Sequence, residues 1–243
     1  MKTLKRILKR MLIAILTIFI VLFVLVALFV NLSPEFGGTI SDTQKEQFLK
    51  SENYKDGVFE NIGGVKMSMG FNDYVKSMRG FFDPQPNTIP EGELPVSKVD
   101  SLDLVNYDGR ARLVWFGHST LLYQIYGKNI LIDPMLGPVP APHPLLGGKR
   151  FSENLPIDIE KLPSIDMVIL SHDHYDHLDY ASILKLKDKV KMFFTPLGVG
   201  SHLVEWGVDK NRVIEMDWWD ETTYDGFFIK CTPAQHFSWS RAY

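Results

Sequence analysis

The chain has 243 residues, of which 45% are hydrophobic and 23% charged, a composition typical of globular proteins. The first ten residues hold five of the 26 basic residues and none of the 29 acidic ones, so the remaining residues carry a net charge of −8. A body of that sign lacks the basic surface that nucleic-acid backbones require, and we expect no nucleic-acid partner. The single cysteine, Cys231, excludes an intramolecular disulfide.

Residues 11–30 predict a transmembrane helix near the amino terminus. They carry no charge and only Thr17 is polar, and at ~1.5 Å per residue they cover the ~30 Å hydrocarbon core of a bilayer. Five basic residues precede them, so the positive-inside rule predicts a cytoplasmic amino terminus and an extracytoplasmic body at the cell membrane. The alternatives are a cleaved signal peptide and a buried core helix. We favour an uncleaved, single-pass signal anchor over residues 1–31, because residues 27–33 offer no small-x-small cleavage site.

Residues 32–107 form a connecting segment with few signals. A short helix is predicted at residues 43–50, capped by the residues before it, and a second helix at residues 71–78. Prolines and a glycine at residues 83–92 predict a loop. Two possibilities stay open for the segment: a stalk between anchor and domain, or a part that packs on the domain and shapes a substrate groove.

From Ala111 onward the pattern changes to strands. Apolar runs occupy residues 113–116, 121–126 and 130–132. Short turns separate them, which predicts an antiparallel meander with one buried face. His118 lies in the first turn, where it either lines a pocket or only satisfies backbone groups. Asp133 ends the third strand, and the stiff proline-rich loop at residues 138–144 is predicted to form one wall of a substrate entrance.

The most informative stretch follows the apolar run 167–170 and reads Ser171-His172-Asp173-His174-Tyr175-Asp176-His177-Leu178-Asp179. A buried strand that ends in a polar loop is where open α/β sheets place their chemistry. In an extended segment alternate side chains share a side, so His172 and His174 can close on one ion. Asp176 and His177 then turn toward a neighbouring position. Imidazole and carboxylate suit zinc or a similar ion, and a solvated polar loop is the alternative.

After this stretch, strands alternate with helices. Strands are predicted at residues 191–196, 212–216 and 226–231, and a helix around residues 202–206. The alternation supports an α/β sandwich rather than a helical bundle. His236 follows the last strand, and taken alone a single histidine is more often structural than a ligand.

Several of these motifs resemble the metallo-β-lactamase superfamily. The pattern His172-x-His174-x-Asp176-His177 is similar to its metal-binding signature. Further similar pieces lie at residues 115–120, 130–134, 217–220 and 232–238. Together they resemble the branch that contains N-acylphosphatidylethanolamine phospholipase D and its bacterial relatives. The resemblance covers about residues 108–243 and implies an α/β fold, the αββα sandwich, of which these residues form the amino-terminal half to two-thirds behind the transmembrane helix.

The resemblance also implies roles for single residues. One zinc ion would be held by His172, His174 and His236, and a second in part by Asp176 and His177. Asp176 would orient the nucleophile, His118 would lie beside the site, and Asp133 would support a ligand from behind. The alternative for Asp133 is that it only ends the strand in an Asp-Pro turn. A metal-bound water, its pKa lowered from about 15.7 to about 7, would supply hydroxide at neutral pH.

The family's remaining ligands, a bridging aspartate and a last histidine, are expected later in the chain than Tyr243. We therefore expect a fragment or a truncated product, which leaves an inner sheet face exposed. The complete domain would bind two zinc ions, whereas this chain would hold one or none and would tend to aggregate. A monodisperse, anchor-deleted protein with two tightly held ions would contradict this expectation.

The function expected for the complete domain is zinc-dependent hydrolysis of phosphodiester bonds in phospholipids, with the lipid bilayer as a partner. Two alternatives stay open. One is an ester, lactone or amide hydrolase of the same fold. The other is a catalytically inactive, membrane-tethered protein that lacks the later ligands. Activity confined to lactones would reject the lipid substrate, and metal analysis would separate the enzyme from the inactive protein.

Overall fold

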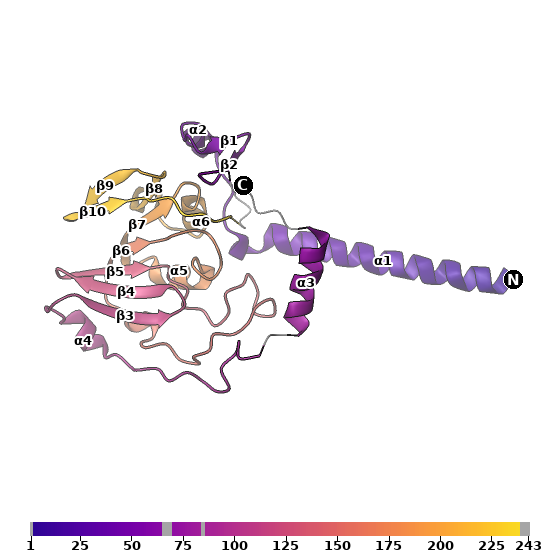
Figure 1. Cartoon of the computed structure of the whole chain (residues 1–243), viewed down its shortest axis with the longest axis horizontal. Helices are drawn as coiled ribbons and strands as arrows, with labels where there is room; N and C mark the ends of the chain where they lie inside the picture. Colours follow the sequence, from indigo (N-terminus) through magenta and orange to yellow (C-terminus); the bar gives the residue numbers. More distant parts are fainter. Residues whose placement is uncertain (1, 65–69, 84–85, 239–243) are drawn as a thin grey trace. The chain divides into compact units, whose positions relative to one another are not determined.

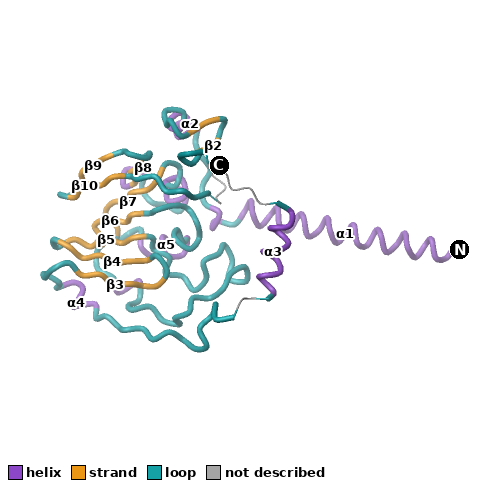
Figure 2. The backbone as a smooth tube through the Cα atoms, in the orientation of Figure 1, coloured by secondary structure: helices purple, strands orange, loops and turns teal. Residues whose placement is uncertain are grey.

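A computed structural model describes residues 2–64, 70–83 and 86–238 of the chain. The chain forms two compact units, Met1–Phe36 and Gly37–Tyr243. The first is built on one long helix and the second on a six-stranded sheet (Figure 1). Figure 2 shows that much of the second unit is loop, including the long connection from β5 (Lys128–Ile132) to β6 (Ile165–Ile169).

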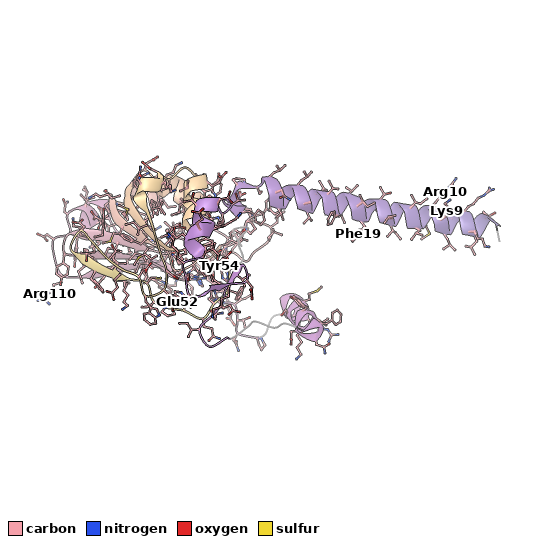
Figure 3. All side chains as sticks on the ribbon, turned by 90° about the horizontal axis from the view of Figure 1, so that it is seen from above. Lys9, Arg10, Phe19, Glu52, Tyr54 and Arg110 are labelled. Atoms are coloured by element: carbon pink, nitrogen blue, oxygen red, sulfur yellow. The ribbon has the colours of Figure 1, made fainter. Side chains whose placement is uncertain are left out.

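The first unit consists of helix α1 (Lys2–Leu32) and the 3-10 turn η1 (Pro34–Phe36). Helix α1 confirms the helix predicted at the amino terminus. At ~1.5 Å per residue its 31 residues extend about 46 Å. Lys9 and Arg10 mark its basic end, and Phe19 lies within the apolar stretch (Figure 3). Residues Thr3–Leu32 are long and apolar enough to cross a membrane.

The second unit is organised around one sheet with the strand order β3-β4-β5-β6-β7-β8. The strands besides β5 and β6 are β3 (Arg112–Gly117), β4 (Thr120–Ile125), β7 (Val190–Pro196) and β8 (Val213–Met216). β3, β4 and β5 are antiparallel, which confirms the predicted meander, and β5 to β8 run parallel. Parallel strands need crossover connections. Those after β6 and β7 contain α5 (Tyr180–Leu186), α6 (Gly200–Glu205) and the turn η3 (Lys210–Arg212).

Helices close one face of this sheet. Along β4, Leu122 and Gln124 are buried and Tyr123 between them is not, as a strand with one core face requires. The core on this face includes Val114, Leu122, Leu131, Val168 and Phe193 from the strands. It also includes Leu104 from α4 (Ser101–Val105), Ile159 from the turn η2 (Ile159–Lys161), and Ile183, Leu186 and Leu203 from α5 and α6.

The opposite face of the sheet is only partly covered. A hairpin lies over it and consists of β9 (Glu221–Tyr224) and β10 (Phe227–Lys230). The Tyr224 ring packs on Phe194 of β7, with 5.5 Å between the ring centroids. On the edge strand β3, Leu113 and Trp115 remain 55% and 60% exposed. The described residues thus form a helical layer and a sheet of the predicted α/β sandwich, with apolar side chains exposed on the inner face at β3.

Residues 37–107 begin this same unit. The helix predicted after Ser41 is α2 (Asp42–Phe48), and the Ser41 hydroxyl oxygen accepts a hydrogen bond from the Gln44 N–H at 3.3 Å. Two short strands, β1 (Tyr54–Lys55) and β2 (Val58–Phe59), follow it. The Phe48 ring packs on the rings of Tyr54 and Phe59, which ties α2 to the hairpin. The second predicted helix is α3 (Phe71–Phe82).

Candidate metal centre

The site lies at the carboxyl end of β6, where the chain leaves the sheet as a loop over residues 170–178. The N–H groups of His177 and Leu178 donate to the His174 carbonyl at 2.9 and 2.7 Å, which folds the loop into a tight turn. Leu178 is 1% exposed and anchors this turn in the core. Asp179 then caps the start of α5 with its side chain. The loop therefore holds its histidines between two rigid elements.

Three histidines, His172, His174 and His236, form a first cluster. Their ligand atoms all lie within 4.8 Å of one another, and their ring centroids are 4.4 to 4.6 Å apart. The Nε2 atoms of His172 and His174 are buried and have no hydrogen-bond partner among the described residues. A buried polar atom without a partner is costly, so a ligand that takes its lone pair fits the observation. Three converging imidazoles suit a first-row metal ion.

A second cluster consists of His118, Asp176 and His177, whose ligand atoms also lie within 4.8 Å of one another. His118 Nε2 lies 2.9 Å from Asp176 Oδ2, and His177 Nε2 lies 3.8 Å from the same oxygen. From the sequence we assigned only Asp176 and His177 to a second ion and placed His118 beside the site. The structure instead adds His118 as a third possible ligand.

His118 reaches this position through the tight turn between β3 and β4. Gly117 has a φ of +100° and His118 a φ of +47°, both in the left-handed region that side chains rarely adopt. The Trp115 indole N–H donates to the His118 carbonyl at 2.9 Å and holds the turn in place. The sequence shows a histidine between two strands, but the sign of its φ decides where the ring points.

Asp133 supports both clusters from behind. It is 4% exposed, and its Oδ2 accepts hydrogen bonds from His177 Nδ1 at 2.9 Å and from the Ser171 hydroxyl at 2.8 Å. A carboxylate only accepts, so Nδ1 of His177 carries the proton. Because the Ser171 hydroxyl donates to Asp133, its oxygen accepts from His172 Nδ1 at 2.8 Å. His172 and His177 are thereby left with an unprotonated Nε2, which is free to bind a metal ion.

The surroundings favour neutral imidazoles in the first cluster. Burial, together with the nearby rings of His177, His174 and His236, lowers the pKa of His172 to about 4. Burial and His236 also lower the pKa of His174. At His177 burial acts in the same direction, but the hydrogen bond and charge of Asp133 outweigh it and raise the pKa. Neutral rings present lone pairs, so His172 and His174 can bind a cation at neutral pH.

The first cluster opens into a cavity of about 1120 Å³. Its lining residues come from segments 58–64, 171–177, 196–199, 216–218 and 231–238. Residues 58–64 of the connecting segment therefore pack on the domain and form a wall of the cavity, which agrees with the second of the two possibilities that the sequence left open. The proline-rich loop at residues 138–144 does not line this cavity, contrary to our expectation. It folds back on itself instead, with Val139 buried and the Pro138 carbonyl accepting from the Arg150 N–H at 3.1 Å.

The wall of this cavity is largely apolar. Phe59, Leu197 and Trp218 contribute apolar surface, while Glu60 and Asp217 are acidic. Among the described residues that line the cavity, none is Lys or Arg. The cavity can therefore take an apolar ligand whose reactive group faces the histidines.

Comparisons with known proteins show which families the chain is similar to. A family model described as the beta-lactamase superfamily domain matches residues 128–242. The chain is 34% identical over 192 residues to an uncharacterized protein of Mycobacterium tuberculosis, across 78% of this chain and 50% of the relative. It is 29% identical over 163 residues to N-acyl-phosphatidylethanolamine-hydrolyzing phospholipase D 1 of Caenorhabditis elegans, across 63% and 45%.

A third relative is a UPF0173 metal-dependent hydrolase of Saccharolobus solfataricus, 32% identical over 130 residues, across 53% of this chain and 52% of the relative. The chain spans about half the length of the curated relatives it matches.

Proposed function

The chain belongs to the metallo-β-lactamase superfamily, and on this premise we propose that it is a metal-dependent hydrolase. The observation that carries the proposal is the pair of adjoining clusters at the end of β6. The rings of His172 in the first cluster and His177 in the second have centroids only 4.0 Å apart. Two clusters this close can serve a single scissile bond.

When bound, metal ions would supply hydroxide from water at neutral pH and polarise the bond to be cleaved. The side chains of the protein prepare this chemistry. His172 offers a buried Nε2 atom, His174 presents Nδ1 3.1 Å from Nε2 of His236, and the hydrogen bonds through Ser171 to Asp133 hold the ring of His172 in one orientation. Asp176 Oδ2 lies 2.9 Å from His118 Nε2 and 3.8 Å from His177 Nε2 in the second cluster, where it can orient the attacking nucleophile or accept its proton.

Zinc is the metal that we propose. Each cluster offers three imidazole or carboxylate ligands, and catalytic zinc sites commonly use three protein ligands and leave one position open. The test is the metal content of the full-length chain, purified in detergent and measured by inductively coupled plasma mass spectrometry. We expect up to two equivalents of zinc, one for each cluster, rather than the one or none expected from the sequence, because His118 gives the second cluster a third possible ligand. Less than one equivalent after incubation with zinc would contradict the proposal.

For the substrate we propose the phosphodiester bond of a phospholipid. Three features support this: the similarity to a phospholipid-hydrolysing enzyme, the apolar cavity wall, and the apolar helix α1. Hydrolysis of an ester, lactone or amide is the second candidate. The cavity wall favours this second candidate in one respect. Its described residues include no Lys or Arg, so they offer no side-chain cation to an anionic phosphodiester.

A substrate panel separates the two candidates. The zinc-loaded full-length chain in detergent micelles is offered a phosphodiester phospholipid, a small chromogenic phosphodiester, and a set of lactones and esters. We expect cleavage of the phosphodiesters and its loss in His172→Ala. Cleavage of lactones or esters alone would favour the second candidate. No cleavage of any substrate by a chain that holds zinc would favour a non-catalytic, membrane-tethered protein.

We further propose that α1 anchors the protein, with the amino terminus in the cytoplasm and the sheet domain on the other side of the membrane. The basic residues at its start support this orientation. Extraction of membranes at alkaline pH should leave the chain in the membrane fraction. A reporter that is active only outside the cytoplasm, fused after residue 238, should be active. If a reporter that is active only in the cytoplasm works at the same position instead, the orientation is the opposite of the one proposed.

A further inference from the structure

His236 lies in a part of the chain without regular structure. Residues 231–238 are neither helix nor strand, and among the described backbone–backbone hydrogen bonds none involves residues 232–236. Yet the Nε2 atom of His236 lies 3.1 Å from Nδ1 of His174. The backbone groups of His236 therefore need a partner outside this segment to hold the ring in register.

Asn61 is that partner. Its Nδ2 donates to the His236 carbonyl at 3.0 Å, and its Oδ1 accepts from the His236 N–H at 3.2 Å. One carboxamide thus satisfies both backbone groups of His236, as a neighbouring strand would, although 175 residues separate the two. The backbone of Asn61 is itself fixed, since its carbonyl accepts from the Gly64 N–H at 3.1 Å in a turn directly after β2.

We propose that Asn61 is a positioning residue for the three-histidine cluster. It holds the backbone of His236 so that the ring stays beside His172 and His174. This role rests on the proposed function, because it matters only if the cluster binds a metal. It also gives the connecting segment a part in the site, although Asn61 lies outside residues 128–242, which match the family model.

The test uses the full-length chain in detergent micelles, loaded with Co²⁺. The variants are Asn61→Ala and Asn61→Asp, with His236→Ala as the reference for loss of the ligand. Asn72→Ala, at an exposed position on α3, is the matched control. Chelator competition measures the affinity for each Co²⁺ equivalent, and visible absorption reports the ligand geometry. Thermal unfolding shows whether each variant folds.

We expect Asn61→Ala to lower the affinity for one Co²⁺ equivalent by about 10–100-fold, as the loss of a residue that orients a metal ligand does at other metal sites. Its absorption spectrum should shift toward that of His236→Ala, while the equivalent bound by His118, Asp176 and His177 is unchanged. Asn61→Asp keeps an acceptor for the His236 N–H but places an oxygen against the His236 carbonyl, so an intermediate loss is expected. If Asn61→Ala does not fold, Asn61→Asp is the variant that tests the proposal.

Two results would overturn the proposal and leave the hydrolase intact. One is wild-type affinity and spectrum in both Asn61 variants. The other is an equal loss at both equivalents together with a lower melting temperature, which would show a general effect on the fold. A wild-type chain that binds no Co²⁺ would instead overturn the proposed function, and the role of Asn61 with it.

Discussion

The Nε2 atom of His236 lies 3.1 Å from Nδ1 of His174, although 62 residues separate them in the chain. Two imidazoles at this distance share either a proton or a metal ion. Because burial and His236 lower the pKa of His174, the neutral ring, which can bind a metal ion, is favoured at this position.

Replacement of His236 tests this pairing. His236→Ala removes one of three possible ligands, so we expect the affinity for the first metal equivalent to fall. Loss of a residue that only orients a ligand costs ~10–100-fold in metal affinity, and the loss of the ligand itself should cost at least as much. Chelator competition on the full-length chain measures it. His143→Ala, in the proline-rich loop, is the control and should bind like wild type. Unchanged affinity in His236→Ala would exclude this histidine from the site.

Asp133→Asn tests the support behind both clusters. The amide oxygen can still accept the hydrogen bond from His177 Nδ1, but the side chain carries no charge. The Ser171 N–H and hydroxyl each donate to one carboxylate oxygen of Asp133, and the amide NH₂ group cannot accept one of these two bonds. We expect a loss of about 10–100-fold in metal affinity with little change in protein yield. The exposed Asp158→Asn serves as control. Equal metal affinity in Asp133→Asn and wild type would mean that Asp133 only ends the strand in a turn and does not support the metal ligands.

Removal of the metal should lower thermal stability. A ligand that binds only the folded state stabilises it by about 2.7 kcal/mol at a hundredfold excess over its dissociation constant. Treatment with a chelator should therefore lower the melting temperature of the full-length chain, and added zinc should restore it. A double variant, His172→Ala with His177→Ala, should respond to neither treatment. The same melting temperature with and without chelator would argue against a bound metal.

A matched pair of leucines tests which face of the sheet is the core. Leu122→Ala, at 0% exposure on β4, should cost about 2–5 kcal/mol of unfolding free energy. Leu113→Ala, at 55% exposure on β3, should stay within about 0.5 kcal/mol of wild type. Denaturant unfolding measures both. A cost at Leu113 as large as at Leu122 would mean that another surface covers the inner face in solution.

Glu215 makes stability depend on pH. Burial raises the pKa of this β8 carboxyl, although hydrogen bonds from Gln44 and the Gly200 N–H act against it. A raised pKa in the folded state means that stability is fully present at acidic pH and is lost as the pH rises through that pKa. Glu215→Gln stays uncharged, so its melting temperature should exceed that of wild type at pH 7 and match it at pH 4.

The control for this prediction is Glu205→Gln, at an exposed position on α6. It should follow the wild-type curve at every pH. The expected gain in Glu215→Gln is a few degrees, since a change of 1 kcal/mol shifts the melting temperature of a domain of this size by about 2–4 °C. A gain of the same size at pH 4 and pH 7 would assign the effect to packing rather than to charge.

The sequence by itself determined several of the elements and the residues at the centre of the site. Local periodicity records which side chains face a core, so the apolar helix α1, the meander β3 to β5 and the strand before His172 were all predictable. The spacing of His172 and His174 likewise places both rings on one side of the chain.

Only the tertiary structure decided what these residues meet. The positive φ of His118 turns its ring toward Asp176, and the path of the chain brings Asn61 to His236. Neither relation is recorded in a local pattern, because a positive φ at a non-glycine residue depends on the turn around it. A contact across 175 residues depends on how the segments pack. The periodicity of the sequence shows whether the side chain at each position is buried. Which other side chain it contacts there depends on the whole fold.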